Sequence, residues 1–128
     1  MHSNMQVMIV DDDELFLSSA RRILERDGTC VTAFVNSRQA ILRIFEGLGT
    51  DLLILDLTMP DFDGIEFMTD LAKVDFRSPL LLVSGWWPET LELATELGRG
   101  IGLNIVGAYE KPFDIARVRT HFGTRRVS

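Results

Sequence analysis

Short apolar runs alternate along the chain with segments in which apolar residues recur every three or four positions. Three runs, at residues 7–10, 52–55 and 80–83, are continuous and consist of Val, Ile, Leu and Met. Such runs are typical of strands that are buried on both faces of a parallel sheet. Weaker candidates at residues 29–34 and 103–109 complete a prediction of five strands.

The segments between and after the runs carry apolar residues at the spacing of one helix face. The five stripes are Phe16, Ala20, Ile23 and Leu24; Ala40, Ile41, Ile44, Phe45 and Leu48; Ile65, Met68, Leu71 and Ala72; Leu91, Ala94 and Leu97; and Ile115, Val118 and Phe122. Strands and helices therefore alternate, which predicts an α/β fold with a parallel sheet and helices on both faces. With five strands we expect the flavodoxin-like, doubly wound order 2-1-3-4-5.

Polar residues stand where the predicted strands end. The first strand ends at Asp11 and Asp12, the third at Asp56, the fourth at Ser84 and the fifth just before Lys111. The carboxyl ends of parallel strands share one edge of the sheet, and the first and third strands are neighbours at the topological switch point. We therefore expect three carboxylates, a hydroxyl and an amine to converge in one crevice.

The expected crevice carries excess negative charge. Three ionised Asp side chains and one Lys leave a net charge of about −2 at neutral pH. Unpaired like charges in a partly buried crevice raise carboxylate pKa values and weaken the fold, and a divalent cation relieves both effects. Oxygen ligands with room for water favour Mg²⁺. The alternative is that these Asp residues cap helices, with Asp12 or Asp13 capping the first; capping does not predict Ser84 and Lys111 at the other strand ends.

Composition narrows the class of protein. The net charge of −6 argues against a sequence-independent nucleic-acid binder, which needs excess Lys and Arg. Cys30 is the sole cysteine, which fits a reducing compartment, and we expect it to be buried. No apolar run reaches the length of a membrane span, and no signal peptide is apparent. We expect a cytoplasmic protein with one domain over residues 1–128, a core over about 5–122 and a tail over 123–128.

Four segments together resemble the receiver domains of two-component signalling. They are Ile-Val-Asp-Asp-Asp at 9–13, the stretch at 51–64 that contains Asp56 and ends in Asp-Gly, Leu-Leu-Val-Ser-Gly at 81–85 and Glu-Lys-Pro-Phe at 110–113. Each pattern is weak alone. All four occur in order, each at a strand end, and the resemblance covers nearly the whole chain.

The resemblance implies a role for each matching position. Asp56 would be the phosphoacceptor and take a phosphoryl group from a phosphohistidine on a sensor histidine kinase or a histidine phosphotransfer protein. Lys111 and Ser84 would contact the phosphoryl oxygens, and the peptide bond between Lys111 and Pro112 would be cis.

The resemblance also implies a set of Mg²⁺ ligands. Asp12 and Asp56 would bind the ion directly, Asp11 would assist through water, and Thr58 would contribute its backbone carbonyl. The phosphorylated domain would be a reversible switch that signals through its fourth and fifth helices.

The chain departs from the family pattern near the predicted fifth strand. Most receivers place Tyr or Phe three residues before the lysine, where this chain has Ala108, and strand alternation points Tyr109 to the side opposite Ala108. Trp86 and Trp87 follow Ser84, and we expect them, with Tyr109, to contribute to a partner surface. The glycine-rich stretch at 97–107 resembles receivers that precede EAL-type cyclic-di-GMP phosphodiesterase domains.

Two other functions remain open on the sequence. A haloacid-dehalogenase-type phosphatase would use Asp11 as its nucleophile, because Asp-x-Asp after an apolar strand resembles the motif of that family. A receiver-like binding module would work without phosphorylation. The complete set of acceptor-site residues argues against this function, although the missing aromatic residue keeps it open. For a true receiver we expect an output partner, of EAL type by the resemblance above, and a homodimer formed through the fourth and fifth helices.

Overall fold

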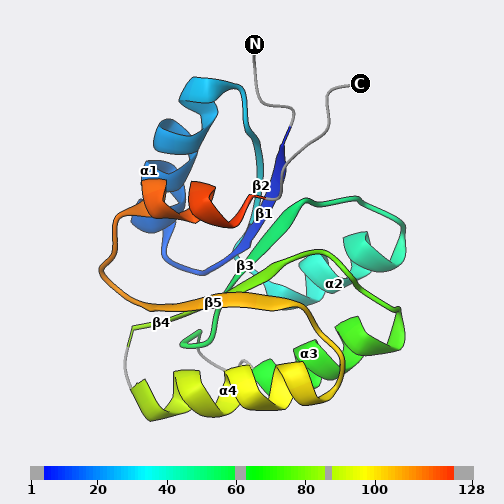
Figure 1. Ribbon diagram of the computed structural model, residues 1–128. Helices are drawn as coiled ribbons and strands as arrows, with labels where there is room; N and C mark the ends of the chain where they lie inside the picture. The colour runs from blue at the N-terminus through cyan, green and yellow to red at the C-terminus, as the bar shows by residue number, and fades with distance from the viewer. Residues whose placement is uncertain (1–4, 60–62, 86–87, 123–128) are drawn as a thin grey trace.

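The computed structural model describes residues 5–59, 63–85 and 88–122 (Figure 1). Its elements are β1 Gln6–Val10, α1 Glu14–Leu24, η1 Glu25–Asp27, β2 Cys30–Phe34, α2 Ser37–Phe45, β3 Leu52–Asp56, α3 Gly64–Lys73, β4 Leu80–Ser84, α4 Pro88–Gly100, β5 Ile105–Glu110 and η2 Ile115–His121. All strand pairs are parallel, in the predicted order β2-β1-β3-β4-β5. Trp86, Trp87 and the predicted tail lie outside the described residues.

Helices cover both faces of the sheet, as predicted (Figure 1). Alternate strand residues face opposite sides, because successive side chains of a strand point to opposite faces. Toward α2, α3 and α4 the sheet buries Met8, Val10, Leu53, Leu55, Leu80 and Leu82. Toward α1 and η2 it buries Val7, Ile9, Leu52, Ile54, Leu81 and Val83. Strands β1, β3 and β4 are therefore buried on both sides, which explains their continuous apolar sequence.

Polar residues cap the N-termini of three helices. Asp13 caps α1, Asn36 caps α2 and Asp63 caps α3, each through a side-chain oxygen that accepts backbone N–H bonds. Helix α1 continues into η1 and ends at Gly28, whose φ of 91° is a left-handed conformation that glycine adopts without strain. The capping prediction is thus correct for Asp13, whereas Asp11 and Asp56 have other contacts.

Several predicted core residues lie at the margins of the apolar stripes. Phe45, Ile65 and Leu97 are exposed, although the helical spacing placed them in the core, and Phe67 is buried instead of Ile65. Cys30 is also exposed, so the prediction of a buried thiol is wrong. It is the first residue of β2, which lies at the edge of the sheet and pairs only with β1.

The predicted final helix forms a 3₁₀-helix, η2, over Ile115–His121. Its buried residues, Ile115 and Val118, are three positions apart, which matches the three residues per turn of a 3₁₀-helix. Arg119 fastens η2 beside α1 by donating to Oδ2 of Asp27 at 2.9 Å and to the carbonyl of Ile23 at 2.8 Å. Within the described ranges, no helix is both long and apolar enough to cross a lipid bilayer.

Strand β5 contains an extra residue relative to β4. Leu80 pairs with Ile105 and Leu81 with Gly107, which leaves Val106 as a bulge. After the bulge, Ala108 pairs with Leu82 and Tyr109 with Val83. The bulge therefore sets which side of the sheet each later side chain of β5 faces.

The glycine-rich segment before β5 has structural reasons for its composition. Gly98 is buried where α4 packs on β5, and a Cβ there would collide with Cδ1 of Ile105. Gly102 has a φ of 97° in the turn after α4, and a Cβ on Gly107 would lie 2.9 Å from His121 Cε1. Packing and turn geometry thus account for three of these glycines.

Candidate phosphorylation site

Three carboxylates meet at the carboxyl edge of the sheet. Asp11 follows β1 directly, and Asp56 is the last residue of the neighbouring strand β3. One oxygen from each of Asp11, Asp12 and Asp56 lies within 4.8 Å of the other two. Asp11 and Asp56 are buried, at 1% and 2% exposure, whereas Asp12 is exposed. The predicted convergence of these residues is confirmed.

The carboxylate of Asp56 has two distinct oxygens. Oδ1 accepts hydrogen bonds from the backbone N–H of Thr58 at 3.0 Å and from the Thr58 hydroxyl at 2.6 Å. Oδ2 lies 3.6 Å from Nζ of Lys111. Thr58 thus orients the carboxylate and leaves the other oxygen facing the amine. The predicted metal contact of Thr58 uses its carbonyl, a different atom from those that bind Asp56 here.

Asp11 carries a buried charge with few donors. Its Oδ1 accepts from the backbone N–H of Asp13 at 2.9 Å, and its Oδ2 lies 2.7 Å from Nζ of Lys111. This second contact is an ion pair, and no other donor contacts Oδ2 among the described residues. Burial raises the pKa of Asp11 to about 6, and the charge of Asp56 adds to this rise while Lys111 and the Asp13 N–H oppose it.

This donor set fits a hard divalent cation. The three acids exceed the charge of one lysine, Oδ2 of Asp11 is buried with only the ion pair to Lys111, and all the available atoms are oxygens. A cation of this kind would neutralise the acids and take carboxylate oxygens as ligands. The cluster is therefore a candidate metal site formed by Asp11, Asp12 and Asp56.

Ser84 and Lys111 stand at the carboxyl ends of β4 and β5, at the same edge of the sheet. The backbone N–H of Lys111 donates to the carbonyl of Ser84 at 2.8 Å, and the peptide bond between Lys111 and Pro112 is cis, as predicted. Burial alone would lower the pKa of Lys111, but its contacts with Asp11 and the charge of Asp56 raise that pKa above the usual value. Lys111 is thus held as an ammonium. Ser84 is the last residue of β4 and is buried.

Two contacts in this region were not anticipated from the sequence. Nζ of Lys111 lies over the ring of Phe16, 4.5 Å from its centroid, although the periodicity assigned Phe16 only to the core. His121, which appeared isolated in the sequence, forms a hydrogen bond with the Tyr109 hydroxyl through Nε2. Both contacts depend on how α1 and η2 pack beside β5, and no sequence motif marks them.

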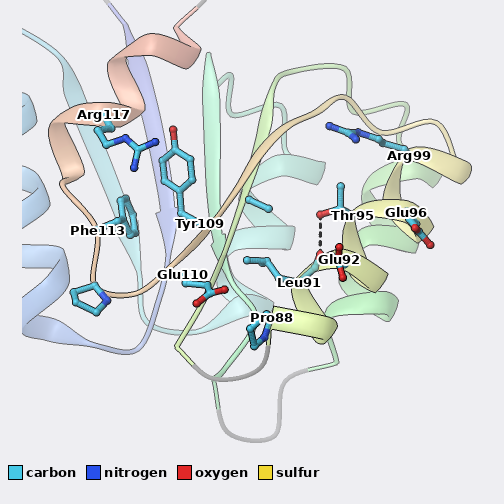
Figure 2. A pocket seen from close by; sticks show the side chains of 12 residues that line it. Pro88, Leu91, Glu92, Thr95, Glu96, Arg99, Tyr109, Glu110, Phe113 and Arg117 are labelled. Carbon is cyan, nitrogen blue, oxygen red and sulfur yellow. Dashed lines mark hydrogen bonds between the residues drawn. The ribbon is translucent and has the colours of Figure 1, made fainter.

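A groove of about 810 Å³ runs beside β5, between α4 and the segment that leads to η2 (Figure 2). Ala108 and Tyr109 both line it. Figure 2 shows Tyr109, Phe113 and Arg117 on one side of β5 and the α4 residues Glu92 and Thr95 on the other. Tyr109 contacts Phe113, His121 and Arg117, and its contribution to a partner surface stays a prediction.

The geometry agrees with comparisons to known proteins. The family model described as "Response regulator receiver domain" matches residues 7–122. The chain belongs to this family. Receiver domains are phosphoacceptor switches, and this function, rather than that of the phosphatase considered above, is the one that the family match supports. The family also implies interaction with a histidine kinase or phosphotransfer protein.

Individual relatives are similar at moderate identity. The transcriptional regulatory protein FixJ of Bradyrhizobium diazoefficiens is 30% identical over 118 residues, which cover 92% of this chain and 55% of FixJ. A response regulator structure from Colwellia psychrerythraea is 31% identical with a TM-score of 0.72, covering 94% of each chain. The beryllofluoride-activated NtrC4 receiver domain dimer is 28% identical with a TM-score of 0.76, covering 91% of this chain and 92% of that one. The chain spans about half the length, or less, of the curated relatives it matches.

Proposed function

We propose that Asp56 is the phosphoacceptor of this receiver domain and that its reaction depends on Mg²⁺ held by Asp11, Asp12 and Asp56, with Thr58 supplying its carbonyl. The observation that carries the proposal is the buried carboxylate of Asp56, placed between two further acids and the ammonium of Lys111. A buried acid with this surrounding is otherwise costly to the fold, so the arrangement calls for a functional reason.

The chemistry is phosphoryl transfer from a phosphohistidine on a sensor histidine kinase or phosphotransfer protein. Oδ2 of Asp56 forms a bond to phosphorus while the phosphorus–nitrogen bond of the donor breaks, and the imidazole leaves with the bonding electron pair. Thr58 holds Oδ1, so Oδ2 is the oxygen that faces Lys111 and the incoming group. When bound, the metal ion would neutralise charge on the transferred phosphoryl oxygens.

Lys111 and Ser84 stabilise the charge that the reaction brings into the site. The raised pKa of Lys111 keeps its ammonium charged at neutral pH, where it attracts phosphoryl oxygens and reduces their repulsion by the acids. The hydroxyl of Ser84, at the end of the adjacent strand β4, donates to the phosphoryl group once Asp56 is modified. Through Ser84 and Lys111 the added charge acts on β4 and β5, which connect the site to α4 and η2.

Acetyl phosphate with Mg²⁺ tests the acceptor. The wild-type chain is expected to gain one phosphoryl group, mapped by mass spectrometry to Asp56, and Asp56→Asn is expected to gain none. Asp63→Asn is a matched control, since Asp63 is an exposed cap of α3. Modification at Asp11 would point to phosphatase chemistry, and no modification to a binding module that works unphosphorylated.

Thermal unfolding tests the metal. Mg²⁺ is expected to raise the Tm of the wild-type chain, because a ligand that binds only the folded state stabilises it. Asp12→Asn removes an exposed ligand and is expected to reduce this rise with little change in the Tm without metal. An undiminished rise in Asp12→Asn would remove Asp12 from the ligand set.

The proposal extends to partners beyond the phosphodonor. An output partner of EAL type and a homodimer formed through α4 and η2 remain our proposals. The groove beside β5 supports the proposal of a contact surface, because residues of both α4 and the segment before η2 line it. The structural roles of Gly98, Gly102 and Gly107 weaken the EAL assignment, which was based on the glycine content of this segment.

A further inference from the structure

The ammonium of Lys111 has three close neighbours. Its Nζ lies 2.7 Å from Oδ2 of Asp11, 3.6 Å from Oδ2 of Asp56 and 4.5 Å from the centroid of the Phe16 ring. The side chain of Lys111 is only 18% exposed. Carboxylates thus contact one part of the ammonium, and an aromatic ring covers another part.

The backbone that carries Phe16 is tied to the acidic cluster. Oδ1 of Asp13 accepts from the N–H groups of Leu15 and Phe16, at 3.1 and 3.2 Å, and so fixes the first turn of α1. The N–H of Asp13 in turn donates to Oδ1 of Asp11 at 2.9 Å. One short network therefore positions Phe16 relative to the same carboxylate that pairs with Lys111.

The ring of Phe16 is also supported from the side of β5. Its centroid lies 5.8 Å from that of the Phe113 ring. The Phe113 centroid lies 5.0 Å from that of the Tyr109 ring, in an edge-to-face arrangement. Tyr109 precedes Lys111 by two residues and Phe113 follows it by two. The three rings form a continuous series of tilted and edge-to-face contacts that begins at the ammonium and ends on β5 beside η2.

We propose that Phe16 is a positioning residue for phosphotransfer, a role that rests on the proposed function of Asp56. A lysine side chain is a flexible stem with a strongly hydrated point charge, so its place must be fixed by its neighbours. The face of the Phe16 ring attracts the ammonium and excludes water from one side of it. The charge of Lys111 then acts on phosphoryl oxygens from a fixed position in a medium of lowered dielectric constant. Phe16 acts through Lys111 and touches no reacting atom.

Substitutions at residue 16 test this role in the full chain with acetyl phosphate and Mg²⁺. Phe16→Leu keeps an apolar side chain but removes the ring, and is expected to lower the rate at saturating acetyl phosphate by about threefold to tenfold. The half-saturating concentration is expected to stay unchanged, because the ammonium acts mainly during transfer. Phe16→Trp restores a ring and is expected to recover the rate to within about twofold.

A double-mutant cycle with Lys111→Met separates positioning from general packing. If Phe16 acts through Lys111, Phe16→Leu has no further effect on the rate when the ammonium is absent. An equal loss of rate in both backgrounds would overturn the proposal, as would a wild-type rate in Phe16→Leu. NMR gives a readout without turnover, since the ring is expected to shift the Lys111 ε-methylene resonance upfield in the wild type and in Phe16→Trp but not in Phe16→Leu.

The outcomes also distinguish this proposal from the one it depends on. If the wild-type chain takes no phosphate on Asp56, the proposed function fails, whatever the NMR spectra show. If Asp56 is phosphorylated and Phe16→Leu changes neither the rate nor the Lys111 resonance, only the role of Phe16 fails. Urea denaturation of each variant verifies that the folded state is fully populated in the rate measurements.

Discussion

On one side of strand β5, Tyr109 packs against Phe113 and His121, whereas on the other side Ala108 borders an open groove beside α4. Arg117 also lies over the Tyr109 ring, 4.8 Å from its centroid. Among the described residues, the aromatic contacts made from β5 are on the side of α1 and η2. The aromatic side chain near the end of β5 therefore packs toward α1 and η2 rather than toward α4.

This difference bears on how a signal could leave the site. Lys111 shares its side of the strand with Tyr109 and is connected to the Tyr109 ring through Phe16 and Phe113. Ring contacts therefore connect Lys111 with η2 through Phe16, Phe113, Tyr109 and His121. On the α4 side, Ala108 is too small to transmit a displacement by packing, and it borders the groove instead.

The largest expected effect on stability comes from removing the Tyr109 side chain, which packs on the side of β5 that faces α1 and η2. Tyr109→Ala removes the contacts with Phe113, His121 and Arg117, and is expected to lower the free energy of unfolding by about 2–4 kcal/mol. Tyr109→Phe is the matched control, which loses only the hydrogen bond to His121 and about 1 kcal/mol. Urea denaturation measures both. Equal stability of Tyr109→Ala and the wild type would show that this side is not well packed.

A smaller effect is expected where α4 packs on β5. A Cβ on Gly98 would collide with Cδ1 of Ile105 and lie 3.1 Å from Sδ of Met68, so Gly98→Ala is expected to lower the free energy of unfolding by about 1–3 kcal/mol. Gly100→Ala is the control in the same helix, because no atom lies within 4 Å of its added Cβ. It is expected to raise stability by up to about 1 kcal/mol, as alanine favours a helix. If both variants behave alike in thermal unfolding, α4 is loosely packed on β5.

The smallest expected effect is a pH dependence of the contribution that His121, in η2, makes to the free energy of unfolding. Burial lowers the pKa of His121, and the nearby charge of Arg117 lowers it further. The unfolded chain then binds a proton at higher pH than the folded chain, so the contribution of His121 to stability is complete above about pH 6.5 and falls as the pH drops below that value. NMR titration of the His121 ring is expected to give a pKa below that of a free histidine.

The same pH range contains an opposite change at the acidic site. The pKa of Asp11 is raised to about 6, so its protonation as the pH falls stabilises the folded state. The free energy of unfolding of His121→Gln, subtracted from that of the wild type at each pH, separates the contribution of His121 from that of Asp11. A difference that does not change between about pH 7.5 and about pH 5.5 would contradict a lowered pKa for the partly buried His121.

The acidic site could be predicted because it depends on strand ends. Continuous apolar runs identified β1, β3 and β4, and the parallel topology then required Asp11, Asp56 and Ser84 to lie at one edge. No knowledge of side-chain packing was needed. The cis peptide before Pro112 was implied by resemblance and is present.

The contacts around β5 could not be predicted in the same way. Phe16 meets Lys111 only because the Asp13 cap sets the start of α1, and His121 meets Tyr109 only because η2 is a 3₁₀-helix fastened by Arg119. Helical periodicity gives the buried face of an element but not its position along the sheet. It also overestimates burial at the margins of a stripe, as it did for Ile65.

The bulge at Val106 has a consequence for how such a strand can vary. If β5 kept its length but paired with β4 without the bulge, every later side chain would move to the opposite face of the sheet, since side chains alternate between the two faces. Tyr109 would then fill the space beside α4, but Lys111 would turn away from the acids in the same step. The contact of Lys111 with the acids therefore requires the bulge, and an aromatic side chain can face α4 at position 108 without disturbing that contact.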